Sequence, residues 1–172
     1  PLKQGPVLPA EALTRVGLDN WLTVSVREDH LLPTVSLAVT LRRGAGSVPR
    51  GQAGLAQLVA EVMNRGAGDR DALALAEAVD AAGASLSVSA GWDSRSVSVS
   101  GLSRDLDFLL AILADVVLEP RFEAGEVEKA RTEQLAALEA ADDNPADLVR
   151  REALVILFPM HRYGLPTSGR KE

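Results

Sequence analysis

One amphipathic stretch decides the fold: Gly54-Leu55-Ala56-Gln57-Leu58-Val59-Ala60-Glu61. Apolar side chains recur at helical spacing along this stretch and just beyond it, forming the stripe Leu55, Leu58, Val59 and Val62. Two glycines that follow closely are typical of a helix end. We therefore predict a helix over residues 52–64, with one apolar face toward a core and one polar face away from it.

Three residues of this helix, Gln57, Ala60 and Glu61, stand at positions i, i+3 and i+4 and project from one face. An inverted zinc motif, H-x-x-E-H, places two imidazole ligands and a general-base carboxylate at the same spacing. Here the positions hold a neutral amide, a methyl group and one carboxylate. An amide is a poor zinc ligand and a methyl group cannot accept a proton, so we predict that this face has lost its metal.

A degenerate metal site is the alternative for this face, with the oxygens of Gln57 and Glu61 as ligands. Zinc prefers nitrogen and sulfur donors, and the sequence places no imidazole nearby. A polar rim on an otherwise packed helix is therefore the favoured interpretation.

Strand patterns precede this helix. Residues 11–17, 21–28 and 35–41 alternate apolar and polar side chains, which is typical of half-buried strands. Asp19-Asn20 has the residue types of a turn between the first two strands. A loop rich in glycine and proline, residues 44–51, separates the third strand from the helix.

The clearest strand pattern lies between residues 85 and 100, where serine alternates with apolar side chains. Gly91 to Ser94 interrupts the alternation and supplies a turn. We therefore predict a β-hairpin with one buried face and one hydroxyl-rich, solvated face. A lone tryptophan at its tip, Trp92, is a weak sign of an aromatic contact.

Helical patterns occupy most of the remaining chain. The predicted ranges are 71–82, 104–117, 123–141 and 145–158, and Asn144 is the expected N-cap of the last helix. Strands and helices come in blocks rather than in strict alternation. This order predicts an α+β fold in which helices pack on one face of an antiparallel sheet.

Composition limits the function classes. The chain has 172 residues, enough for one domain with a core, and a net charge of −6 from 18 basic and 24 acidic residues. This balance disfavours binding to nucleic acid or an anionic membrane, and no apolar run is long enough to span a bilayer. The absence of cysteine excludes disulfides and thiolate metal sites. Arginine and alanine are abundant, which indicates a bacterial source. The compartment stays open between bacterial cytoplasm and periplasm.

No catalytic constellation of another type is present. The two histidines, His30 and His161, have no ligand-spaced partner, so structural or solvent roles are expected for both. The stretch from Gly44 to Ser47 lacks the lysine and spacing of a phosphate loop. Asp142-Asp143-Asn144 lacks the ligand spacing of a calcium loop and is interpreted as a connection between helices.

Seven segments carry a resemblance to a known family when taken in order. They are Leu18 to His30, Leu32 to Val39, Arg43 to Ser47, Gln52 to Ala56, Leu118 to Phe122, Asp142 to Pro145 and His161 to Gly169. In order and spacing they resemble the N-terminal domain of the insulinase/pitrilysin family of zinc metallopeptidases, which includes the mitochondrial processing peptidase. The resemblance implies that residues 1–172 form such a domain, incomplete at its C-terminal end and without the second, similar domain.

The resemblance also implies a third metal ligand, a glutamate on a later helix. Alignment through Asp142 to Pro145 puts this position at Ala137, beside Ala136. The ligands and the base would then all be replaced, at Gln57, Ala60, Glu61 and Ala137. No cofactor is expected in this chain, and zinc is expected only in an active partner.

A peptide-binding edge is a further implication of the resemblance. In the family an extended peptide adds as a strand beside the zinc, at the segment that matches Gly83, Ala84, Ser85, Leu86 and Ser87. Strand addition needs only free backbone N–H and C=O groups, so it could survive loss of the metal. Cover by a partner domain is the alternative for this edge.

These implications favour a catalytically silent subunit that binds substrate or regulates beside a zinc-bearing partner. The partner would be a family member with an intact H-x-x-E-H motif, in a homo- or hetero-oligomer. An active metalloendopeptidase with unconventional ligands is one alternative, and a purely structural core subunit is another.

Overall fold

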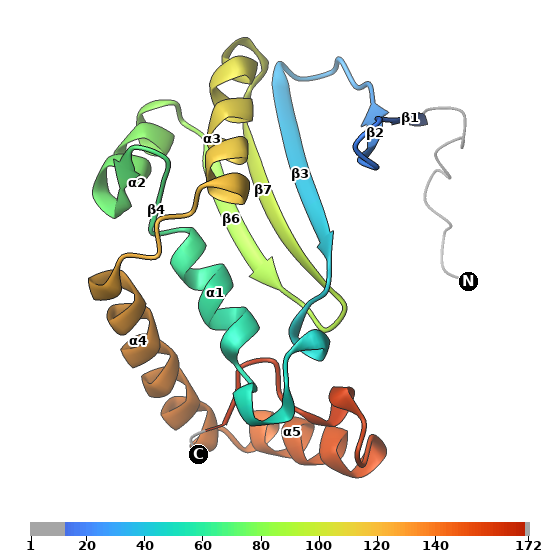
Figure 1. The fold of residues 1–172 in the computed structure, drawn as a ribbon, viewed down its shortest axis with the longest axis vertical. Coiled ribbons are helices and arrows are strands. Elements are labelled where there is room, and N and C mark those ends of the chain that lie inside the picture. Colours follow the sequence, from blue (N-terminus) through green and yellow to red (C-terminus); the bar gives the residue numbers. More distant parts are fainter. Residues whose placement is uncertain (1–12, 171–172) are drawn as a thin grey trace. The chain divides into compact units, whose positions relative to one another are not determined.

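The computed structural model describes residues 13–170 of the chain (Figure 1). It divides into two compact units, Pro1–Pro33 and Thr34–Glu172. Each unit has its own β structure, and the second contains all the helices of the described chain. The two units are considered separately below.

The first unit is an antiparallel hairpin of β1 (Leu13–Gly17) and β2 (Thr23–Arg27). Its turn is closed by a hydrogen bond from Leu18 N to Leu22 O at 2.8 Å, and the Asn20 side chain accepts from Leu22 N at 3.2 Å. Both strands and the Asp19-Asn20 turn are thereby confirmed within the described residues, while residues 11 and 12 of the first predicted strand lie outside them. The half-buried character expected of these strands is wrong, because all their residues are exposed in the structure. A histidine beyond the hairpin, His30, is exposed and lies 3.5 Å from the Glu28 carboxylate.

The second unit is built on a three-stranded antiparallel sheet of order β3-β7-β6. The strands are β3 (Thr34–Arg42), β6 (Ser85–Ala90) and β7 (Ser94–Leu102). Register places Leu37, Val99 and Leu86 in one row on the core face, and Ser36, Ser100 and Ser85 in a row on the other face. The predicted hairpin, with one apolar and one hydroxyl-rich face, is confirmed.

Five helices follow the predicted ranges closely. They are α1 (Leu55–Met63), α2 (Ala72–Ala81), α3 (Leu106–Leu118), α4 (Ala124–Asp142) and α5 (Pro145–Leu157). The N-caps Asp71 and Asn144 accept from Ala74 N at 2.8 Å and from Ala146 N at 3.0 Å, which confirms the expected cap of α5.

Two local features differ from the predictions. The first helix does not start at residue 52, because Gly54 has a φ of 95° that an L-residue rarely adopts and α1 begins only after it. A short ribbon of β4 (Gly66–Ala67) and β5 (Arg70–Asp71), which was not predicted, joins α1 to α2. Strands of two residues are too short for their periodicity to be read from sequence.

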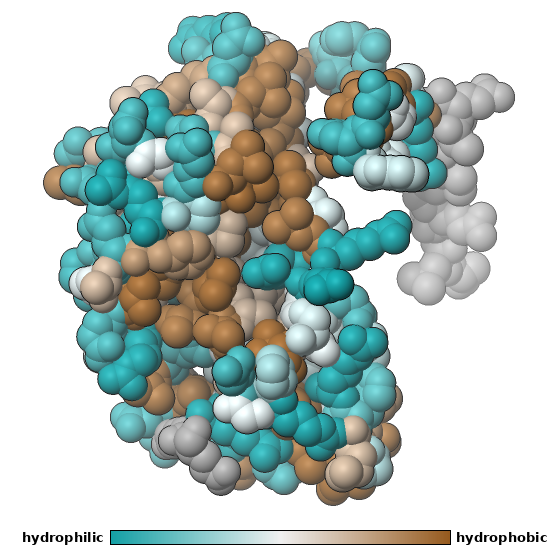
Figure 2. Space-filling view, in the orientation of Figure 1, coloured by the Kyte–Doolittle hydropathy of each residue, from teal (hydrophilic) through white to brown (hydrophobic). Residues whose placement is uncertain are grey.

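The core lies between the sheet and the helices that cover one of its faces (Figure 1). Its largest fully buried side chains are Leu75, Leu109, Ile112, Val62, Val97, Val99 and Val116. Figure 2 shows hydrophobic side chains gathered along α3 and α1 on this side of the molecule, and hydrophilic ones along α4. The predicted α+β fold, an antiparallel sheet with helices on one face, is confirmed.

A pair of neighbouring leucines in α3 tests this core. Leu109 is 0% exposed and Leu110 is 45% exposed. Leu109→Ala should lower the free energy of unfolding by about 2–5 kcal/mol because it leaves a cavity, whereas Leu110→Ala should change it by less than about 1 kcal/mol. Urea unfolding followed by circular dichroism measures both, and equal losses would contradict the position of the core.

Candidate functional site

Three of the four positions matched to zinc ligands and base line one pocket. Gln57 and Glu61 reach it from α1 and Ala137 reaches it from α4, and its volume is about 270 Å³. Ala60 does not line this pocket, because it is only 3% exposed and packs inside the fold. The structure thus brings together Glu61 and Ala137, which are 76 positions apart in sequence.

An arginine that the sequence reasoning missed holds the carboxylates beside this pocket. Arg65 lies one turn beyond Glu61, and their charged groups are 3.0 Å apart. It also hydrogen-bonds Glu133 and lies 3.7 Å from Glu126, both on α4. The i, i+4 spacing of Glu61 and Arg65 was a visible signal for the first pair. The pairs of Arg65 with Glu126 and Glu133 could be identified only from the tertiary structure, because these residues are far apart in sequence.

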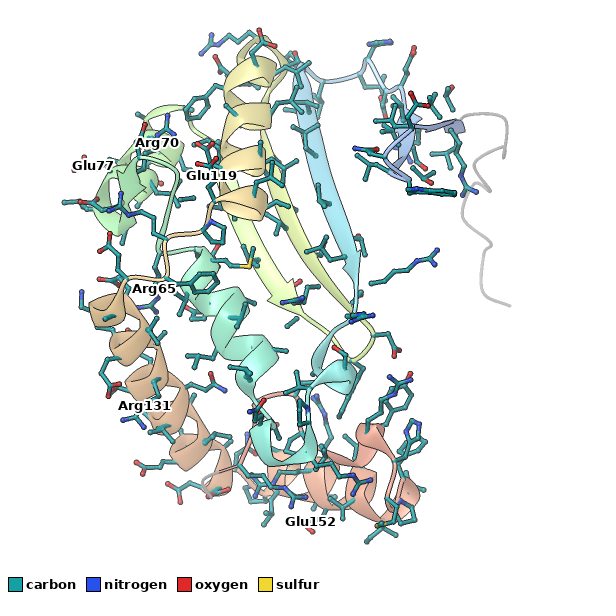
Figure 3. The ribbon with its side chains drawn as sticks, in the orientation of Figure 1. Arg65, Arg70, Glu77, Glu119, Arg131 and Glu152 are labelled. Atoms are coloured by element: carbon teal, nitrogen blue, oxygen red, sulfur yellow. The ribbon has the colours of Figure 1, made fainter. Side chains whose placement is uncertain are left out.

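Charge and burial make Arg65 the electrostatic centre of this cluster. Its side chain is only 16% exposed and comes from the end of α1 where α4 passes (Figure 3). The hydrogen bond to Glu133 is the largest cause that raises the pKa of Arg65 above its usual range. The same bond lowers the pKa of Glu133 below that of an ordinary carboxyl group. The guanidinium therefore stays charged and cross-links the two helices.

The residues present do not fit a zinc ion. The donor set at the pocket consists of amide and carboxylate oxygens, and zinc favours nitrogen and sulfur. Glu61 and Glu133 already share the positive charge of Arg65, which would repel a divalent cation. No group of three or more potential metal-binding side chains (His, Cys, Asp or Glu) occurs within residues 13–170.

Two glycines hold the C-terminal segment against the start of α1. Gly54 and Gly169 have φ values of 95° and 94°. A Cβ on Gly54 would lie 2.9 Å from the Gly169 α-carbon and from Ser168 O. Gln134 of α4 completes the contact, because its Nε2 donates to Gly54 O at 3.2 Å and to Ser168 O at 2.8 Å. Three distant segments therefore meet where only glycine fits.

An aromatic cluster holds the preceding part of the segment on the tip of the β6–β7 hairpin. The Tyr163 hydroxyl donates to Asp93 Oδ2 at 2.6 Å, a bond that raises the pKa of Tyr163, and its ring lies 5.5 Å from that of Trp92. His161 accepts from Tyr163 N through Nδ1 at 3.2 Å and packs its ring edge-on against Tyr163. Its role is thus capping and packing.

The segment matched to the peptide-binding edge, Gly83 to Ser87, does not line the pocket that contains Gln57 and Glu61. Gly83 leads into β6, which is an outer strand, and no described strand pairs with its second edge. Ala84, Ser85 and Leu86 line a separate pocket of about 340 Å³ with residues of α2 and with Asn64. This pocket shares no lining residue with the one at Gln57. Asn64 Oδ1 is buried here without a hydrogen-bond partner in the described structure.

Comparison with known proteins identifies the family of this chain. The chain belongs to the insulinase family (peptidase family M16), whose model matches residues 23–171. A Mycobacterium bovis protein named an uncharacterized zinc protease is 31% identical over 172 residues, covering 97% of this chain and 39% of the relative. A non-peptidase homolog from Helicobacter pylori is 29% identical over 165 residues, covering 94% of this chain and 38% of the relative.

A solved structure is also similar. The inactive domain of a peptidase M16 protein from Pseudomonas fluorescens matches with a TM-score of 0.84 and 26% identity, covering 91% of this chain and 38% of its own. The chain therefore spans about two-fifths of the length of these proteins. The names "non-peptidase homolog" and "inactive domain" fit a catalytically inactive family member. Within the described residues, none of the helices has the length and apolar character to cross a membrane.

The contact between Gly54 and Gly169 predicts that one added methyl group at residue 54 destabilises the fold. Gly54→Ala should lower the free energy of unfolding by about 2 kcal/mol, because it forces a positive φ and meets backbone atoms. Gly51→Ala is the control, since a Cβ there meets nothing within 4 Å. Chemical denaturation compares the two, and hydrogen exchange should show residues 165–169 released only in Gly54→Ala. Equal effects would contradict the contact.

The Arg65 cluster predicts a stability loss that depends on pH. Arg65→Met should destabilise by about 1–2 kcal/mol at neutral pH. Arg131→Met, which removes an exposed i, i+3 pair with Glu128, should have a much smaller effect on stability. Because the pKa of Glu133 is lowered in the fold, its contribution is fully present above the ordinary carboxyl pKa and is lost progressively as the pH falls through the lowered pKa of the folded state. The loss caused by Arg65→Met should therefore shrink below about pH 4, and a loss independent of pH would contradict this account.

Proposed function

We propose that this chain is the N-terminal domain of a catalytically silent family member, which binds peptide and supports a zinc-bearing partner. The observation that carries the proposal is the pairing of Glu61 with Arg65 in place of a metal-ligand set. Among the four matched positions only Glu61 has a carboxylate, and Arg65 holds it. Without an imidazole or a free general base, the pocket cannot activate water in the way that a zinc peptidase does.

Peptide binding is proposed at the outer edge of β6, along Gly83 to Ser87. An extended peptide that adds to this edge would pair with backbone groups that no described strand uses. The adjacent pocket offers room for alternate side chains, with Asn64 Oδ1 as an acceptor in need of a donor. This activity depends on the sheet and not on a metal.

Two other functions are supported by the names of relatives. Several bacterial relatives are named uncharacterized zinc proteases, which favours a metalloendopeptidase that uses unconventional ligands. A Caenorhabditis elegans relative, cytochrome b-c1 complex subunit 1, is 30% identical over 118 residues, covering 69% of this chain and 25% of that protein. That likeness favours a purely architectural subunit.

The full-length protein distinguishes these functions. We expect elemental analysis after purification with added zinc to find far less than one zinc per chain, and no chelator-sensitive cleavage of peptides. Glu61→Ala should leave this result unchanged. Stoichiometric zinc together with cleavage that Glu61→Ala abolishes would establish the enzyme and overturn the proposal.

Peptide capture separates the silent binding subunit from the architectural one. The full-length protein should retain peptides from a random pool and co-purify with a family member that has an intact H-x-x-E-H motif. A matching pool with N-methylated backbones should bind much more weakly, because strand addition needs the peptide N–H groups. Retention of neither pool would favour the architectural subunit.

A further inference from the structure

A second pocket lies beside the one lined by Gln57, Glu61 and Ala137, and its charged lining residues are mainly basic. Its volume is about 260 Å³, and it lies between the end of α4, the first turns of α5 and the hairpin tip. It shares Leu138, Ala141 and Ser168 with the pocket that contains Gln57 and Glu61. The two pockets are therefore neighbours that share these three lining residues.

Basic side chains dominate the ionic lining of this second pocket. Arg150 and Arg151 line it from α5, and Asp147 is the only acidic lining residue. The lining has an excess of one positive charge, although the whole chain has a net charge of −6. The first pocket has the opposite character, because its charged lining residues are Glu61 and Glu133.

The two arginines are held in different ways. Arg151 is 26% exposed and donates from Nη2 to Asp142 at 2.8 Å, which orients its guanidinium. Arg150 is an exposed lining residue of the same pocket. Asp147 accepts a hydrogen bond from Asn144 Nδ2 at 2.9 Å, which engages the one competing carboxylate.

The opposite wall is aromatic and is fixed in place. Trp92 is half-buried, its ring lies 5.5 Å from that of Tyr163, and Tyr163 is hydrogen-bonded to Asp93. Leu154 and Pro166 add apolar surface, and Thr167 adds a hydroxyl group. The planar guanidinium groups of the two arginines can bind a carboxylate. The apolar side chains opposite them can contact the apolar or extended chain to which that carboxylate is attached.

We propose that Arg150 and Arg151 form a subsite for a carboxylate of the bound peptide, either an acidic side chain or the C-terminal group. This inference rests on the peptide-binding function proposed above and adds a charge preference to it. The hairpin links the two sites, because Trp92 lies in the turn that begins where β6 ends at Ala90, and β6 is the strand at whose edge the peptide is placed. The subunit would thus select acidic peptides at a position beside its neutralised metal site.

The test uses the full-length protein and a random peptide pool of one length with amidated C-termini. Bound peptides are recovered and sequenced by mass spectrometry. We expect enrichment of aspartate and glutamate at one position, and about a tenfold loss of that enrichment in Arg150→Gln. The charge-matched control is Arg104→Gln, an exposed arginine of a turn outside the pocket, which should retain the enrichment.

A second pool with free C-termini identifies the source of the carboxylate. If the free terminus competes for the subsite, it should raise retention and reduce the acidic enrichment, and Arg150→Gln should reverse both effects. Arg151→Gln provides a second variant, and its thermal unfolding shows whether loss of the Asp142 pair affects the fold.

The outcomes separate this inference from the function on which it rests. Retention of peptides without acidic enrichment, and without a difference between the two pools, would overturn the carboxylate subsite and leave peptide binding intact. Enrichment that Arg150→Gln and Arg104→Gln reduce equally would also overturn it, since general charge would then be the cause. Failure to retain either pool would overturn both proposals.

Discussion

The packing of α1 against α4 is the constraint on which the rest of this structure depends. At the end of α1, Arg65 draws Glu61, Glu126 and Glu133 together. At its start, Gln134 and the contact between the two glycines join it to α4 and to the C-terminal segment. Since α1 also lies beside β6, both candidate sites take their positions from this one helix.

An arginine can cross-link two helices by pairing with carboxylates on both, where a metal would do so by coordinating donor atoms from both. The guanidinium of Arg65 binds two carboxylates through directed hydrogen bonds and needs no imidazole. It differs from a metal in one respect that matters for function, since it cannot lower the pKa of a bound water or polarise a carbonyl as a Lewis acid. A helix pair held in this way can keep its geometry while its chemistry is lost, which is the basis of the silent-subunit proposal.

Most of the fold was predictable because its signals are local. Alternation of serine with apolar residues marked the hairpin, periodic leucines marked α3, and Asn144 marked the start of α5. Family resemblance predicted that Ala137 stands at the third ligand position, which stays a prediction, and the structure shows that Ala137 and Gln57 line one pocket. The β4–β5 ribbon and the partners of Arg65 were missed, because short ribbons lack periodicity and ion pairs between helices depend on packing.

By itself, then, the sequence determined the order and type of the longer elements and the family, and it predicted a loss of zinc-type donors at α1, since each of these depends on residue identity and close spacing. Only the tertiary structure decided what surrounds these positions. It placed Ala60 in the interior, put Glu133 against Arg65, and brought Arg150 and Trp92 into the lining of one pocket. Such pairings join residues that are far apart in the chain, and they arise from how helices pack on a sheet.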